Sequence, residues 1–287
     1  MNEQNHWSQE QENTSTLGIR VLLGIFRLGG RALFHLSLWP VVVFFWLTVS
    51  RSRNASRAYL QQMARFTGTS APFLGSLRHL MRFSDTILDK ILAVSGSFGP
   101  QDLNVVNADE ILNDARGGII VTAHTGCVEL CQAMSETQQA RRRLHVLVHT
   151  VHAVRFNNLI RKINPQFAVN HIEVTSIGPQ TAVELSSFIE RGDWIVIVAD
   201  RTPIGSSSTI NISFLGKKAP FAAGPFILAH VLECPAWSMI CTRETSPASR
   251  ARYRVEFSKI SEPRPVSRHE RNAAIAEMAE RWVKTLE

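Results

Sequence analysis

The feature that most limits how this chain can fold is an alternation of short apolar runs with helical stretches after Asn107. Apolar strands separated by helices of this length are typical of βαβ units, whose parallel sheet is covered on both faces. We therefore expect an α/β domain over residues 107–287, with a mostly parallel sheet flanked by helices. The strand-like runs are 117–123, 144–150, 168–174, 194–200, 236–242 and 253–259. The helical stretches are 128–139, 154–164, 181–192, 224–233 and 268–287.

The N-terminal third has a different pattern. Residues 1–16 are polar and are expected to be disordered, without the basic start of a secretory signal. Residues 17–53 contain an uncharged apolar stretch, Leu33 to Val49, with arginines on both sides. About 17 apolar residues is the lower limit for spanning ~30 Å of hydrocarbon. This predicts a membrane anchor, either one short spanning helix or a re-entrant pair hinged at Gly29-Gly30 or Pro40. A buried hairpin of a soluble domain is the other interpretation.

Residues 54–106 form the connection between the anchor and the α/β domain. Apolar spacing from Ala55 to Leu92 indicates helix, and Gly99-Pro100 closes the region, so we expect a helical collar. The four cysteines, Cys127, Cys131, Cys234 and Cys241, lack the spacing of a zinc or redox motif. They are interpreted as reduced and mostly buried.

The formal net charge of +7 points to acidic partners. Nucleic acid, an anionic membrane surface and an acidic carrier protein are all compatible with it. The basic residues are dispersed among apolar strands, without a basic stripe studded with aromatic residues, which disfavours nucleic acid.

Two strand ends carry polar groups that could do chemistry. The run 117–123 leads into His124, and the run 194–200 ends in Asp200-Arg201. Ligands of open parallel sheets bind beyond the carboxyl ends of the strands. His124 and Glu129 are five residues apart, roughly 140° on a regular helix, so they can touch only if His124 lies in a turn before the helix. Gly126 allows the backbone of that turn to adopt dihedral angles that other residues disfavour.

In this arrangement Glu129 fixes one imidazole nitrogen of His124 and leaves the other as a base. The helix start also offers backbone N–H groups to an oxyanion or a phosphate. The plainer interpretation is a histidine that ends a strand and a glutamate that caps a helix. Cys127 is interpreted as packing rather than as a nucleophile. His145, His149, His152 and His171 have no acidic partner at ligand spacing, so no metal site is predicted.

The stretch AHTGCVEL resembles the His-x4-Asp/Glu signature of glycerolipid acyltransferases, in the glutamate form of the lauroyl and myristoyl transferases of lipid A biosynthesis. RFNNLIRKIN is similar to the family's Arg-x-x-Asn segment. GDWIVIVADR and FLGKKAPFAAGPFILAHVLECPAW are similar to its Asp-Gln/Arg, Phe-x-Gly and Gly-Pro-x-x-x-Ala elements, in the same order. The resemblance extends from the anchor to about Thr242.

The resemblance implies transfer of a fatty acyl chain from an acyl-carrier-protein or CoA thioester to a hydroxyl of a lipid or glycolipid. His124 would be the general base and Glu129 its partner, with no covalent acyl-enzyme and no cofactor besides the acyl thioester. Arg155 and Asn158 would bind phosphate, although a solvated helix face explains them equally well. Asp200 and Arg201 would orient the acceptor head group or hold a phosphate, or else form a structural ion pair. Lys217 would be a basic substrate contact or an exposed loop residue.

The implied partners are an acyl carrier protein, anionic membrane lipids and a lipid acceptor. The implied location is the bacterial inner membrane, with the catalytic domain facing the cytoplasm. The chain lacks the Pro-x-x-Trp tail of the lipid A enzymes, so the acceptor is open between a lipid A precursor and another lipid, such as an ornithine-type or polyene-type glycolipid. The rival interpretation is a non-catalytic, membrane-tethered lipid-binding protein on the same scaffold. An α/β-hydrolase esterase would need Gly-x-Ser-x-Gly, which does not occur.

Overall fold

The computed structural model describes residues 16–98, 100–127, 129, 143–148, 171–173, 179–202, 208–245, 249 and 251–287. The chain divides between Leu92 and Ala93 into two compact units, which are described separately. The expected disordered segment 1–16 lies outside the described residues, apart from Thr16.

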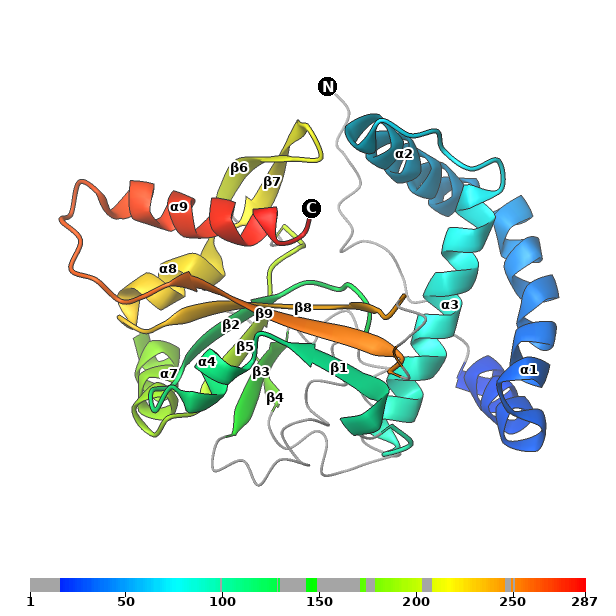
Figure 1. The fold of residues 1–287 in the computed structure, drawn as a ribbon, viewed down its shortest axis with the longest axis horizontal. Coiled ribbons are helices and arrows are strands. Elements are labelled where there is room, and N and C mark those ends of the chain that lie inside the picture. The colour runs from blue at the N-terminus through cyan, green and yellow to red at the C-terminus, as the bar shows by residue number, and fades with distance from the viewer. Residues whose placement is uncertain are drawn as a thin grey trace. The chain divides into compact units, whose positions relative to one another are not determined.

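The C-terminal unit is built on a seven-stranded sheet in the order β1-β9-β8-β2-β5-β3-β4 (Figure 1). Strands β8, β2, β5, β3 and β4 run parallel to one another, so the expected α/β fold with a mostly parallel sheet is confirmed. The strands are β1 Leu103–Val106, β2 Gly118–Thr122, β3 Leu144–Val148, β4 His171–Glu173, β5 Trp194–Val198, β8 Ala236–Arg243 and β9 Tyr253–Ser261.

One edge of the sheet departs from the βαβ expectation. Strand β9 pairs antiparallel with β8, and β1 pairs parallel with β9. Only residues 244–252 join β8 to β9, and a connection of that length suits antiparallel neighbours but is too short for a crossover helix. Strand β1 lies in the region that the sequence assigns to the helical collar, because four residues are too few to show a strand period.

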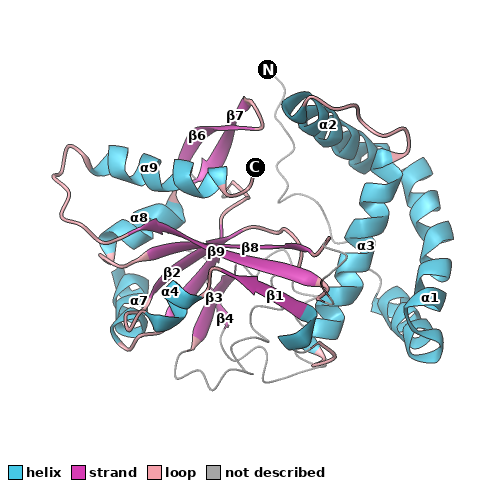
Figure 2. Cartoon of the chain, viewed as in Figure 1, coloured by secondary structure: helices cyan, strands magenta, loops and turns pink. Residues whose placement is uncertain are grey.

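Hydrophobic side chains are buried on both faces of the sheet, as the apolar strands predict. Figure 2 shows helices beside the sheet. Helices α7 Pro179–Glu190, α8 Gly224–Val231 and α9 Arg271–Lys284 contribute to the core on one face. The 3-10 turn Pro100–Asp102 precedes β1, and the short helix α4 Asp109–Asn113, which follows β1, contributes to the core on the other face. Side chains alternate along β2, with Ile119 and Val121 on the first face and Ile120 on the second. This alternation decides on which face the residues that follow β2 emerge.

A two-stranded hairpin, β6 Thr209–Phe214 and β7 Lys217–Ala222, was not predicted. Its turn consists of Leu215 and Gly216, with φ of 51° and 75°. Positive φ at both central residues is the backbone of a type I′ turn. The hairpin packs on α9, where the Phe221 and Trp282 rings lie 5.9 Å apart. Trp282 also donates from Nε1 to the carbonyl oxygen of Val121, 3.2 Å away.

The N-terminal unit is helical and consists of α1 Thr16–Thr48, α2 Ser50–Thr67 and the greater part of α3 Gly75–Val94. Helix α1 kinks at Gly29-Gly30, where Gly30 has φ 61° and ψ −157°, and it continues through Pro40. Within it, Leu23–Thr48 is long and apolar enough to cross a membrane, judged by length and composition alone. The helix expected from Ala55 to Leu92 is interrupted at Gly68, whose left-handed backbone caps α2.

Candidate active site

The register of the sheet brings two polar residues together at the carboxyl ends of the parallel strands. Thr122 of β2 pairs with Val198 of β5, so His124 and Asp200 each lie two residues beyond a matched pair. The ladder continues past the strands, because the Ala199 N–H donates to the Thr122 carbonyl at 2.9 Å. Residues two apart on an extended chain point to the same face, so the two side chains meet. His124 Nδ1 lies 2.8 Å from Asp200 Oδ1.

The Asp200 carboxylate decides which nitrogen of His124 carries the proton. Burial by itself raises the pKa of Asp200, but the hydrogen bond and the charge of His124 outweigh it and leave the pKa below its ordinary value. An ionised carboxylate can only accept, so Nδ1 must be the donor in this pair. The neutral imidazole then has its lone pair on Nε2, which contacts no hydrogen-bond partner in the described part of the chain. A histidine held in this way has the form of a general base.

The turn after β2 is anchored on the end of β8. Gly126 has φ 57°, and a Cβ on it would lie 2.4 Å from the Cys241 carbonyl oxygen, so only glycine fits. The Cys127 N–H donates to Cys241 Sγ at 3.4 Å, and that thiol donates to the Cys127 carbonyl at 3.3 Å. These contacts fix the backbone that presents His124. The sequence predicted the role of Gly126 in the turn, but no spacing pointed to Cys241.

Glu129 lies close to the same turn. Its Oε2 is 3.7 Å from the thiol of Cys127, a distance that a sulfur donor can bridge. The carboxylate paired with Nδ1 of His124 is that of Asp200, 76 residues away, rather than the expected Glu129. The catalytic role of Glu129 stays a prediction. Cys127 is fully buried, as its interpretation as a packing residue expects. Cys127, Cys234 and Cys241 are buried and form no disulfide bond, as expected of buried thiols, whereas Cys131 lies outside the described residues.

The other predicted site residues are distributed unevenly. Arg201 follows Asp200 directly and has an exposed side chain. Lys217 is exposed at the start of β7, next to the turn of the hairpin. Arg155 and Asn158 lie outside the described residues. The structure therefore brings His124, Asp200 and the turn with Cys127 together, and it places Lys217 on a separate hairpin.

Two buried hydroxyl groups lie beside the histidine. Thr122 Oγ1 and Thr125 Oγ1 have no hydrogen-bond partner among the described residues. Buried hydroxyl groups in proteins are usually hydrogen-bonded, so an unpaired one at a site is a candidate for contact with a ligand. Thr125 is adjacent to His124 in the turn, which makes its hydroxyl the better placed of the two.

His145 has an acidic partner that its sequence neighbours did not reveal. Its Nε2 lies 3.0 Å from Asp193 Oδ2, and its ring stacks on Phe188 with 4.0 Å between centroids. Asp193 also accepts a hydrogen bond from the backbone N–H of Arg143. The residue is buried and its contacts join β3 to the start of β5, so we interpret it as structural.

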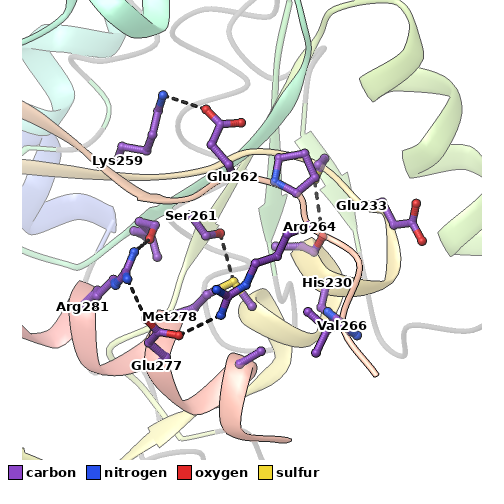
Figure 3. A pocket seen from close by; sticks show the side chains of 15 residues that line it. His230, Glu233, Lys259, Ser261, Glu262, Arg264, Val266, Glu277, Met278 and Arg281 are labelled. Atoms are coloured by element: carbon purple, nitrogen blue, oxygen red, sulfur yellow. Dashed lines mark hydrogen bonds and ion pairs between the residues drawn. The ribbon is translucent and has the colours of Figure 1, made fainter. Parts of the chain in front are cut away.

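A pocket of about 390 Å³ lies at the opposite edge of the sheet, where β9 ends and β8 begins (Figure 3). Several of its charged lining residues are paired with one another. Glu277 contacts both Arg264 and Arg281, at 3.0 and 2.6 Å. Glu262 contacts Lys259 at 2.7 Å. This pocket lies at the other edge of the sheet from His124, and most of its charged side chains are paired within the protein, so we place the candidate site at the carboxyl edge instead.

Comparison with known proteins adds no assignment. No protein-family model matches the sequence, and no curated protein matches it. The resemblance of its four motifs to lipid acyltransferases stays a prediction.

Proposed function

We propose that this protein is a membrane-associated acyltransferase, which moves a fatty acyl chain from a thioester to a hydroxyl of a lipid or glycolipid. The observation that carries the proposal is the pair of His124 Nδ1 and Asp200 Oδ1 at 2.8 Å, at the carboxyl edge of a parallel sheet. The apolar stretch Leu23–Thr48 supports a lipid acceptor. The motif resemblance supports acyl transfer rather than another use of a histidine base.

In the proposed reaction, Nε2 of His124 removes the proton of the acceptor hydroxyl while its oxygen attacks the thioester carbonyl carbon. The carbon–sulfur bond then breaks, the new ester is released, and the thiolate takes the proton from the imidazolium. Asp200 holds the imidazole and stabilises its charged form. General-base assistance contributes roughly 10²–10⁴ in rate. Backbone N–H groups of the turn and the Thr125 hydroxyl are the groups proposed to stabilise the oxyanion.

For the other residues the proposal follows the motif resemblance. Glu129 supports the turn and the histidine, and Arg155, Asn158, Arg201 and Lys217 bind the polar parts of the donor or acceptor. The donor is an acyl carrier protein or CoA thioester, and no cofactor is invoked. The location is the bacterial inner membrane, with the catalytic unit on the cytoplasmic side.

The test is transfer of a labelled acyl chain from acyl-carrier-protein thioester to a total lipid extract, by the full chain in membranes. His124→Ala should lower transfer by about 10²- to 10⁴-fold. His269→Ala, at an exposed histidine whose ring lies by Ser267, is the matched control and should retain full activity. Wild-type transfer by the His124 variant would exclude the mechanism. Absence of transfer by the wild-type chain with either thioester would exclude the proposed function.

A further inference from the structure

Helices α1 and α3 run side by side in opposite directions (Figure 1). Arg31 contacts Asp85 and Asp89, at 2.7 and 2.5 Å, and His35 Nε2 contacts Asp85 at 3.1 Å. Further along, Trp46 Nε1 donates to the Ser76 hydroxyl at 2.9 Å. As the residue number rises along α1 it falls along α3, so the two helices are antiparallel, with side-chain contacts near Arg31 and again at Trp46.

Helix α1 has one covered face and one open face. Phe34, Leu38 and Val42, spaced four apart, are only 3 to 4% exposed. The outward face carries Leu36, Phe44 and Leu47, which are 70, 61 and 61% exposed. No charged residue occurs between Ala32 and Thr48. Isolated exposed apolar residues are ordinary, but a row of this size on one helix marks an interaction surface.

This packing is incompatible with a helix α1 that crosses a bilayer. If α3 stayed in place, its exposed Arg78 and Arg82 would enter the hydrocarbon, where ionised side chains are strongly disfavoured. If α3 came away, Asp85 and Asp89, which are 2 and 0% exposed, would lose their ion pairs with Arg31. An α1 that lies in the interface keeps α3 on its water-facing side and meets neither penalty.

The charge of the N-terminal unit indicates which kind of surface the outward face of α1 binds. From Thr16 to Leu92 the only acidic residues are Asp85 and Asp89, and both are buried against Arg31. The exposed charges of its helices are therefore positive. They include Arg51, Arg57, Arg65, Arg78 and Arg82. Basic side chains around an apolar helix face are typical of helices that lie in the surface of an anionic bilayer.

We propose that residues 16–92 bind one leaflet of an anionic membrane as a monotopic module, with α1 lying in the interface after the Gly29-Gly30 kink. Leu36, Phe44 and Leu47 enter the acyl region, and the arginines lie among the lipid head groups. The inference concerns topology and not catalysis, so it stands whether or not the chain transfers acyl groups.

The decisive experiment is a topology assay on the full chain, with one protease-sensitive tag before Met1 and another after Glu287. Right-side-out and inside-out membrane vesicles are treated with protease. A monotopic chain has both tags on the same side, so both are cleaved in one preparation and protected in the other. Cleavage of the two tags in opposite preparations means that α1 spans the bilayer and overturns the proposal. No substitution is needed, so misfolding of a variant cannot obscure the result.

A binding assay tests the lipid-contacting face. Leu36→Glu should weaken binding of the full chain to phosphatidylglycerol-containing vesicles by about 10- to 100-fold, because it puts a charge in place of an apolar side chain that enters the acyl region of the bilayer. Val183→Glu is the matched control, since Val183 is 72% exposed on α7 of the other unit. Equal losses in both variants, or no loss in Leu36→Glu, would contradict the proposal. Loss of binding to an acyl carrier protein with vesicle binding intact would assign the face to a protein partner and also contradict it.

Discussion

Replacing Asp200 by asparagine separates two roles that this carboxylate could have. The asparagine keeps the shape and can still accept from Nδ1, but it removes the charge that stabilises the imidazolium. Two unit charges 4 Å apart interact by about 1 kcal/mol in water and about 4 kcal/mol near a protein surface. His124 and Asp200 side chains are 41 and 28% exposed, so the lower part of that range applies. We expect a loss of about 1–2 kcal/mol, or about 5- to 30-fold in kcat.

The assay is steady-state acyl transfer with varied concentrations of a lipid acceptor. A positioning role predicts that kcat falls while the KM for the acceptor is unchanged, because Asp200 contacts the histidine and not the substrate. A head-group role, which the sequence favours, predicts a raised KM instead. Arg201→Gln is the neighbouring control and should alter KM rather than kcat. An unchanged kcat with a raised acceptor KM in Asp200→Asn would refute the reasoning.

Two further substitutions and one thiol-modification experiment test the C-terminal unit. Gly126→Ala places a Cβ 2.4 Å from the Cys241 carbonyl oxygen, at a residue with a φ of 57°. Thermal melting should therefore show a loss of stability of about 1–3 kcal/mol or more, and acyl transfer should fall. A melting temperature equal to that of the wild type would contradict this. Thr125→Val removes a buried, unpaired hydroxyl, so stability should be unchanged or higher while transfer falls; unchanged transfer would remove Thr125 from the site. Burial raises the pKa of the Cys234 thiol to about 12, so a thiol reagent at pH 8 should modify Cys234 only after denaturation, as mass spectrometry of peptides would show.

The pH dependence of stability offers a check on the pair itself. The folded pKa of Asp200 lies below its ordinary value, so the pair stabilises the protein fully above that ordinary value, and the contribution is lost as pH falls through the folded pKa. The difference in melting temperature between wild type and Asp200→Asn should therefore be largest near neutral pH and shrink in strong acid. A difference that grows on acidification would contradict the pairing.

Strands that lie within longer apolar runs of the sequence were predictable, and elements without such a run were not. The apolar run from Trp194 to Val198 is short and rich in β-branched residues, which favours a buried strand over a helix, and it forms β5. Strand β1 has only four residues and does not lie within a longer apolar run. The β6–β7 hairpin depends on a positive φ at Leu215, which is uncommon for a leucine and is therefore not expected from the sequence. The antiparallel pairing of β9 follows from the short connection after β8. A prediction from hydrophobic periodicity alone does not take the length of that connection into account.

The partner of His124 shows why local spacing is a poor guide to a site in a parallel sheet. Spacing proposes only near neighbours such as Glu129, whereas Asp200 reaches the histidine because β2 and β5 are adjacent, although β3 and β4 intervene in the sequence. From the sequence, His124 and Asp200 follow strands that end at the same edge, but the order of those strands is a property of the packed sheet. Once Thr122 is known to pair with Val198, the meeting of the two residues follows from the pleat alone. The His-x4-Glu spacing then corresponds to the tight turn at Gly126, and the strand register explains how His124 is held.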